Sequence, residues 1–118
     1  MFRRKYRNTK VTVNGMIFDS KQEYRRYELL TTLQDIGQVT ELVRQPRFVL
    51  MDGYRDSDGK WIRPITYTAD FQYTESNGQV VVEDVKSFIT AQDPTYRLKK
   101  KLFHKLYPQY TFREWTGK

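Results

Sequence analysis

The segment ITYTADFQYTESNGQVVVEDVKSF (65–88) constrains the fold more than any other part of the chain. Two runs rich in Val, Ile, Tyr, Phe and Thr flank a Ser-Asn-Gly sequence, which predicts an antiparallel β-hairpin. The first run carries Asp70, and the second, apolar enough for a central strand, carries Glu83, Asp84 and Lys86. Because an unpaired charge inside a sheet is costly, these side chains need partners or a ligand.

The length of the turn decides which of these side chains meet. A two-residue Asn-Gly turn sends Asp70 and Asp84 to opposite faces of the sheet. A three-residue Ser-Asn-Gly turn, closed by a glycine in the left-handed conformation, places Asp70 directly opposite Asp84. In that register Lys86 shares the face of Asp84, whereas Glu83 points to the other face and is expected to be structural. The prediction of a shared site therefore depends on the three-residue turn.

Two carboxylates that face each other across a ladder repel, and a divalent cation reverses the sign of that interaction. Asp70, Asp84, the backbone carbonyl of Val85 and water are oxygen ligands of the kind that suit Mg²⁺ or Mn²⁺. Lys86 can hold a water or stabilise negative charge that develops on a phosphate. The alternative is a solvated sheet face with a cross-strand ion pair, which fits a central, Val-rich strand less well. The pattern thus favours metal-assisted hydrolysis of phosphodiesters.

The remaining segments predict one mixed α/β domain over residues 1–118, with a basic arm over 1–10, a hairpin over 11–18 and a core over 19–115. Within the core we expect a helix over 19–37, extended chain over 39–51 with a bend or edge at Pro46, a polar loop or wide hairpin connection over 52–64, the hairpin, a helix over 95–107 and a strand over 109–115. The first hairpin strand is expected to be continuous from Ile65 to Thr74, and the leucines at 98, 102 and 106, four apart, indicate the second helix.

Composition and charge narrow the class of protein. The chain has no cysteine, which excludes disulfides and thiolate chemistry and fits a reducing cytoplasm. No apolar run approaches the ~20 residues of a membrane span, and we expect a cytoplasmic protein without a membrane partner. Residues 1–10 and 94–118 carry +5 and +6, whereas residues 11–93 carry −4. A nuclease needs both carboxylates for cations and basic residues for phosphates, whereas a protein that only coats nucleic acid does not.

Asp70 followed by Asp84-Val85-Lys86 resembles the motif of the PD-(D/E)XK nuclease superfamily, an aspartate on one strand and acid-x-lysine on the next. Ala69 stands where that motif usually has proline. The family core, a helix, three strands, a helix and a strand, matches the predicted order over roughly 19–115. The segments FDSKQE, QPRF, YTADF, VVVEDVK and LKKKLF are similar to a family of small uncharacterised phage-encoded proteins. That family is related to Holliday-junction-resolving endonucleases, and the segments also resemble the endonuclease subunit of some transposases.

The resemblance implies a restriction-endonuclease-like core with an added N-terminal hairpin. It implies a Mg²⁺- or Mn²⁺-dependent DNA endonuclease, a phage or prophage protein that acts in the host cytoplasm on branched or recombination DNA. It also implies a glutamate of the first helix near the metals, and Glu23 is the matching position. A capping box between Ser20 and Glu23 is an equally simple explanation of that glutamate. Action on two strands at once favours a homodimer.

Basic residues at both ends are expected to contact the DNA backbone, although a solvated helix face explains the second group equally well. They are Arg3, Arg4, Lys5 and Arg7 in the arm, and Lys99, Lys100, Lys101 and Lys105 in the second helix. Gln45 either reaches the site or is a polar edge residue. We expect His104 to be a surface residue, and Trp61 could stack on a base. Two other functions stay open: a non-catalytic nucleic-acid-binding β module and an inactive nuclease-like partner.

Overall fold

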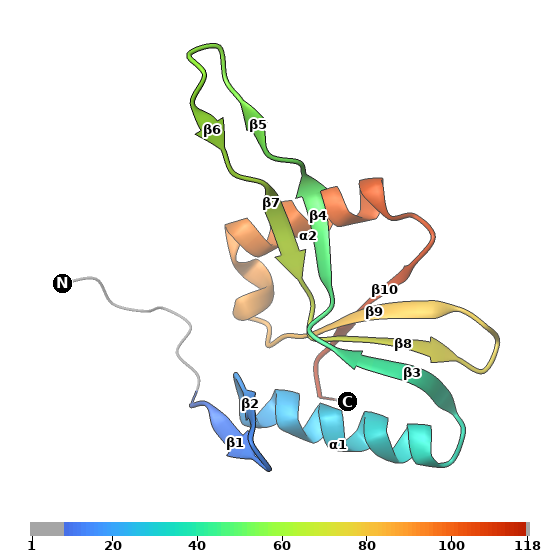
Figure 1. The fold of residues 1–118 in the computed structure, drawn as a ribbon. Coiled ribbons are helices and arrows are strands. Elements are labelled where there is room, and N and C mark those ends of the chain that lie inside the picture. Colours follow the sequence, from blue (N-terminus) through green and yellow to red (C-terminus); the bar gives the residue numbers. More distant parts are fainter. Residues whose placement is uncertain (1–8, 118) are drawn as a thin grey trace.

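The computed structural model describes residues 9–117, and its centre is a four-stranded sheet with the order β10-β9-β8-β3 (Figure 1). The strands are β3 (Val39–Arg44), β8 (Phe71–Glu75), β9 (Val80–Val85) and β10 (Thr111–Trp115). Strand β8 pairs antiparallel with both β3 and β9, and β10 runs parallel to β9. Helix α1 (Lys21–Asp35) packs on one face and α2 (Pro94–Leu106) on the other, so the fold is mixed α/β as predicted.

The turn between β8 and β9 has the three-residue form, which confirms the register that the site requires. Glu75 donates its N–H to the Gln79 carbonyl at 2.9 Å and accepts from the Gly78 N–H at 2.9 Å. Gly78 has φ +89°, a left-handed conformation that residues with a side chain rarely adopt. The ladder that follows places Asp70 opposite Asp84, one pair beyond the last ladder pair of the two strands.

The prediction of one continuous strand from Ile65 to Thr74 was wrong, because the chain breaks at Ala69 and Asp70. Before the break, β7 (Ile65–Thr68) pairs with β4 (Arg47–Met51). After it, β8 pairs with β3 and β9.

The chain between β3 and β4 breaks at the same level as Asp70, at Gln45 and Pro46. Two hydrogen bonds cross the two breaks: the Gln45 N–H donates to the Asp70 carbonyl at 2.9 Å, and the Ala69 N–H donates to the Pro46 carbonyl at 3.0 Å. Gln45 adopts φ +54°, so the ribbon turns there without losing its pairing. The bend expected at Pro46 is confirmed, and Asp70 lies at the same bend on the neighbouring chain segment.

The bend divides the hydrophobic core into two clusters, one on each side of the sheet. Toward α2, buried Tyr67 and Ala69 join Val82 of β9. Toward α1, buried Phe71 and Tyr73 join Val81. Tyr67 and Phe71 would share a face in a continuous strand, and the break separates them.

The leucine spacing correctly indicated α2, but of these leucines only Leu102 packs against the core. Leu98 is 58% exposed and Leu106 is 47% exposed. The helix instead buries Tyr96 and Phe103, and the Phe103 ring packs edge-on against Phe48 with centroids 4.9 Å apart. Aromatic side chains from β4 and β10 occupy the space under α2, so aromatic residues of the helix fill it best.

The other predicted elements form as expected. The N-terminal hairpin consists of β1 (Val11–Val13) and β2 (Met16–Phe18). Ser20 caps α1 by accepting from the Glu23 N–H at 3.1 Å, and Asp93 caps α2. Segment 52–64 is a hairpin, with β5 (Tyr54–Arg55) and β6 (Trp61–Ile62) projecting from the body as a narrow arm (Figure 1). In the described part of the chain, neither helix is long and apolar enough to span a membrane.

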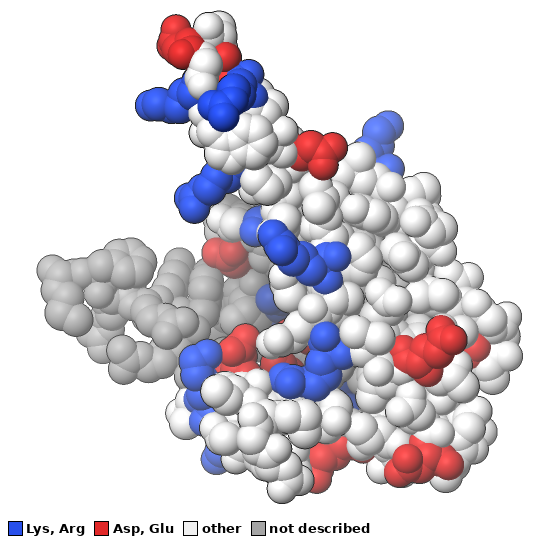
Figure 2. Space-filling model, viewed as in Figure 1, with Lys and Arg blue, Asp and Glu red and all other residues white. Residues whose placement is uncertain are grey.

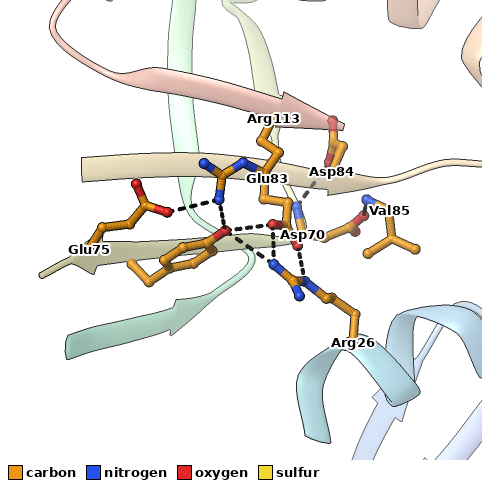
Figure 3. A network of polar contacts seen from close by, with 8 residues as sticks. Arg26, Asp70, Glu75, Glu83, Asp84, Val85 and Arg113 are labelled. Carbon is orange, nitrogen blue, oxygen red and sulfur yellow. Dashed lines mark hydrogen bonds and ion pairs between the residues drawn. The ribbon is translucent and has the colours of Figure 1, made fainter. Parts of the chain in front are cut away.

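A buried ion pair fixes α1 on the sheet (Figure 3). Arg26 donates to both carboxylate oxygens of Glu83 on β9, at 2.7 and 2.8 Å. The Tyr73 hydroxyl donates to Glu83 at 2.6 Å, and the Arg26 guanidinium lies 3.8 Å from the centre of the Trp115 ring. Glu83 is fully buried, so it depends on these partners for its charge. The structural role predicted for Glu83 fits this position.

Replacing Arg26 with Met is expected to lower the free energy of unfolding by about 3–5 kcal/mol, because the Glu83 carboxylate would be left buried and unpaired. The double variant Arg26→Met/Glu83→Leu should recover a large part of that loss. Urea unfolding followed by circular dichroism measures both. The exposed Lys10–Asp19 pair, at 2.9 Å, is the control, and Lys10→Ala should change little. Equal, small effects of the Arg26 and Lys10 substitutions would contradict this role.

Candidate functional site

Asp70 and Asp84 lie opposite each other at the bend, and each carboxylate binds a backbone amide of the other strand (Figure 3). Asp84 Oδ1 accepts from the Asp70 N–H at 3.0 Å. Asp70 Oδ2 accepts from the Val85 N–H at 2.8 Å. Asp84 Oδ2 also accepts from the Tyr67 hydroxyl, and the Asp84 residue is 2% exposed. The three-residue turn considered in the sequence analysis correctly predicted that Asp70 lies opposite Asp84.

Burial and mutual repulsion disfavour the charged forms of these carboxylates. Burial, followed by the charge of Asp84 and that of Glu23, raises the pKa of Asp70 to about 8. Burial also raises the pKa of Asp84, although the Tyr67 hydrogen bond and the charge of Lys86 oppose the shift. The N–H groups and the lysine therefore offset only part of the cost of placing two carboxylates together.

Glu23 lies in the first turn of α1, is 4% exposed and lines the same cavity as Asp70, Val85 and Lys86. One of its oxygens accepts from the Asp19 N–H at a long 3.4 Å, and the other, Oε2, is buried without a hydrogen-bond partner among residues 9–117. Burial raises the pKa of Glu23. Glu23 thus completes a cap and also leaves one oxygen free at the cavity.

Lys86 follows directly after β9 and lines both cavities that open at Asp70. Its ammonium lies 4.3 Å from the centre of the ring of Tyr96, a residue of α2. This cation–π contact holds the charge of Lys86 beside Asp84. The Tyr96 hydroxyl donates to Glu114 at 2.5 Å, and Lys100 donates to the same carboxylate at 3.1 Å. Glu114 pairs with Asp84 across the parallel β9–β10 ladder. Tyr96 therefore links Lys86 to a second acidic residue of the sheet.

The basic residues predicted to contact DNA do not all lie at the candidate site. Lys99 lines the cavity of Asp70 and Asp84, whereas Lys100 is paired with Glu114. Lys101 lies with His104 at a separate cavity on α2, and Lys105 is exposed. His104 is a surface residue, as expected, with its ring against Phe112. The contacts predicted for Arg3, Arg4, Lys5 and Arg7 lie outside the described residues.

Gln45 touches the site through its backbone, since its N–H binds the Asp70 carbonyl. Its side chain is exposed and lines neither cavity at Asp70. Over residues 9–117, no group of three or more Asp, Glu, His or Cys side chains is arranged to hold a metal ion. The aspartates therefore form a pair rather than a complete carboxylate cluster with Glu23.

The sequence did not predict three residues of the site, which are Tyr67, Tyr96 and Glu114. A continuous strand would turn Tyr67 away from Asp70, so only the break at Ala69 brings its hydroxyl to Asp84. Tyr96 stands in the first turn of the helix that Asp93 caps, a position that could have suggested closeness to the end of β9. The position of Glu114 depends on the parallel β9–β10 register, for which the chain carries no local signal.

The fold and the site together define a mixed α/β protein with a pair of carboxylates, buried Asp84 and half-buried Asp70, at a bend in its sheets. The chain belongs to a family described as Protein of unknown function (DUF1064), whose model matches residues 3–118. No curated protein and no solved structure gives a significant match to the chain. Because the family description assigns no activity, the function has to be argued from the site.

The raised pKa of Asp70 makes the stability of the metal-free protein depend on pH. An aspartate in the unfolded chain has a pKa of about 3.9, and folded Asp70 has a pKa of about 8. Between these values the folded protein binds a proton that the unfolded chain has released, so stability falls as pH rises from about 4 to 8. Asp70→Asn keeps an acceptor for the Val85 N–H but does not titrate. It should therefore be more stable than the wild type at the upper end of this range.

Thermal unfolding in a chelator, measured at steps across that pH range, checks this expectation. The wild type should lose several degrees of melting temperature relative to Asp70→Asn as the pH rises. Asp35→Asn, at the exposed C-terminal end of α1, is the control and should follow the wild type. Parallel curves for all three proteins would contradict a strongly shifted Asp70.

Proposed function

We propose that the protein is a metal-dependent DNA endonuclease of the PD-(D/E)XK type. The observation that carries the proposal is the pairing of Asp70 with Asp84 at the bend, with Lys86 beside them on the same strand end. An aspartate on one strand and an acid-x-lysine on its neighbour is the arrangement that this nuclease motif requires. The register on which that arrangement depends is the observed one.

The residues at the site fit a divalent cation. Both aspartates have raised pKa values, with Asp84 buried and Asp70 half-buried, and among the described residues Glu23 Oε2 has no partner beside the adjoining cavity. Asp70, Asp84 and the Val85 carbonyl would hold Mg²⁺ or Mn²⁺, with Glu23 contributing to a second ion. A cation bound there would lower the pKa of a bound water and neutralise charge on the phosphate.

The protein's own groups have distinct tasks in this proposal. The Val85 N–H and the Asp70 N–H orient the two carboxylates, and the Tyr67 hydroxyl fixes the second oxygen of Asp84. The Lys86 ammonium orients water and stabilises the negative charge that builds up on the phosphate. Lys99, at the same cavity, contacts the phosphate backbone of the bound strand.

The order of elements supports the finer assignment of the fold. Helix α1, strands β3, β8 and β9, helix α2 and strand β10 follow the order of a restriction-endonuclease-like core, after the N-terminal hairpin. Strands β4 to β7 form a ribbon inserted between β3 and β8. As part of the same proposal, the enzyme is a phage or prophage protein that acts as a homodimer on branched or recombination DNA in the host cytoplasm.

A cleavage assay tests the proposal. The protein is incubated with linear, nicked and four-way-junction DNA in Mg²⁺ or Mn²⁺, beside Asp84→Asn and Lys86→Ala. The wild type should cleave at least one of these substrates, and each variant should lose about 100-fold or more in rate because an essential charge is removed. Asp35→Asn should cleave like the wild type. If no substrate is cut and both variants still bind DNA, the protein is a non-catalytic nucleic-acid-binding module or an inactive nuclease-like partner.

Glu23 provides a separate test of the metal site. Glu23→Gln removes a buried charge, so it should raise the melting temperature in a chelator and weaken Mn²⁺ binding measured by calorimetry. Ser20→Ala removes the helix cap and should lower stability by about 1 kcal/mol without changing Mn²⁺ affinity. The same Mn²⁺ affinity in the wild type and Glu23→Gln would restrict Glu23 to its capping role.

A further inference from the structure

The arm formed by β5 and β6 is a feature for which the proposed chemistry has no use. It projects from the body at the far end of the β4–β7 ribbon (Figure 1). Tyr54 is 49% exposed and Trp61 is 52% exposed, so neither aromatic residue serves a hydrophobic core. Large exposed aromatic side chains on a projecting element are typical of a surface that binds a partner.

The arm has a defined shape. Asp56 Oδ1 accepts from the N–H groups of Asp58 and Lys60, each at 2.9 Å, and the Arg55 guanidinium donates to the Gly59 carbonyl at 2.9 Å. The Trp61 ring lies so close to Gly53 that a Cβ atom there would come within 2.4 Å of a ring carbon. These contacts hold the turn and the indole in place before any partner binds.

Charge is distributed unevenly between the two limbs of the arm. Residues 60–68 contain Lys60 and Arg63 and no Asp or Glu, whereas the other limb and the tip carry Asp52, Asp56 and Asp58 with one basic residue, Arg55. Figure 2 shows acidic side chains at the end of the arm and Lys or Arg side chains along it below them. The basic limb runs through β7 directly to Asp70.

The cavity of the candidate site opens along that same limb. Thr66 and Thr68 of β7 line it together with Asp70 and Asp84. Trp61 and Asp70 are nine positions apart in the chain. Extended chain rises about 3.3 Å per residue, so these two residues lie up to roughly 30 Å apart. One turn of duplex DNA is about 34–36 Å long.

The width of the arm fits duplex DNA as well. Its two strands are about 5 Å apart, and the major groove, about 12 Å wide, admits a two-stranded β-ribbon.

We propose that the β5–β6 arm binds in the major groove of duplex DNA, about one helical turn from the bond held at Asp70 and Asp84. Lys60 and Arg63 contact phosphates, and Trp61 packs against the wall of the groove. The position of the cleaved bond rests on the proposed function, whereas the DNA contact of the arm does not.

Fluorescence anisotropy with duplexes of about 8, 12, 16 and 24 base pairs tests the arm, with the full chain in Asp84→Asn background so that cleavage does not interfere. Affinity should rise once the duplex spans both the arm and the site, at about 12–16 base pairs. Trp61→Ala and Arg63→Ala should each weaken binding to the longest duplex about 5-fold or more and leave binding to the shortest one unchanged. Arg63→Ala should also reduce the slope of log affinity against log salt by about one.

Asp58→Asn at the tip is the matched control and should bind as tightly as the background protein or more tightly. Arg63 makes none of the contacts that shape the arm, so its variant is informative even if Trp61→Ala disturbs the ribbon. Equal affinities of all variants at every length would overturn the proposal. So would a loss that is the same for single strands, which would indicate stacking on unpaired bases, or failure of every variant to bind DNA, which would point to a protein partner.

The two proposals fail separately. Length-dependent binding through Arg63 without cleavage of any substrate by the wild type would leave the arm's role standing and reject the nuclease. Metal-dependent cleavage that is lost in Asp84→Asn, with no effect of Arg63→Ala on binding, would do the reverse.

Discussion

The bidentate ion pair between Arg26 and Glu83 is the contact on which the arrangement of the site depends. It fixes the rotation and position of α1 on the sheet, and Glu23 lies one turn before Arg26 on that helix. Glu83 directly precedes Asp84, so the alternation of β9 sends one carboxylate to the helix and the other to the site. A single strand thus anchors the helix on one face and presents an acidic group on the opposite face.

The bend at Asp70 adds a cost that the folded chain only partly offsets. Backbone amides and the Tyr67 hydroxyl bind the two carboxylates, yet the pKa values stay raised because burial, joined at Asp70 by the charges of Asp84 and Glu23, outweighs these bonds. A protein selected for stability alone would gain from Asn at either position. An unfavourable electrostatic energy of this kind, at a cavity and next to a lysine, is typical of functional sites.

The sequence predicted the parts of the structure that depend on local signals. The Ser-Asn-Gly sequence limited the hairpin to two registers, of which the structure has the three-residue one, and the capping box of Ser20 stands at the start of α1. The break at Ala69 escaped prediction because that segment contains no proline or glycine, and its cause lies in the neighbouring chain at Pro46. Tyr67 was missed with the break, and Glu114 was missed because parallel pairing between distant strands has no local signature.

Charge distribution favours a hydrolytic site over a surface that only binds nucleic acid. Phosphates approaching Lys86 and Lys99 must come near Asp70 and Asp84, which repel them. A binding module would be improved by the loss of these carboxylates, since each lowers affinity for a polyanion. Retaining them is useful only if a proton or a cation neutralises them when DNA binds. A proton would leave Glu23 Oε2 buried without a partner among residues 9–117, whereas Asp70, Asp84 and Glu23 could serve a divalent cation as oxygen ligands beside Lys86. The unpartnered oxygen of Glu23 is therefore the feature that best separates the two interpretations.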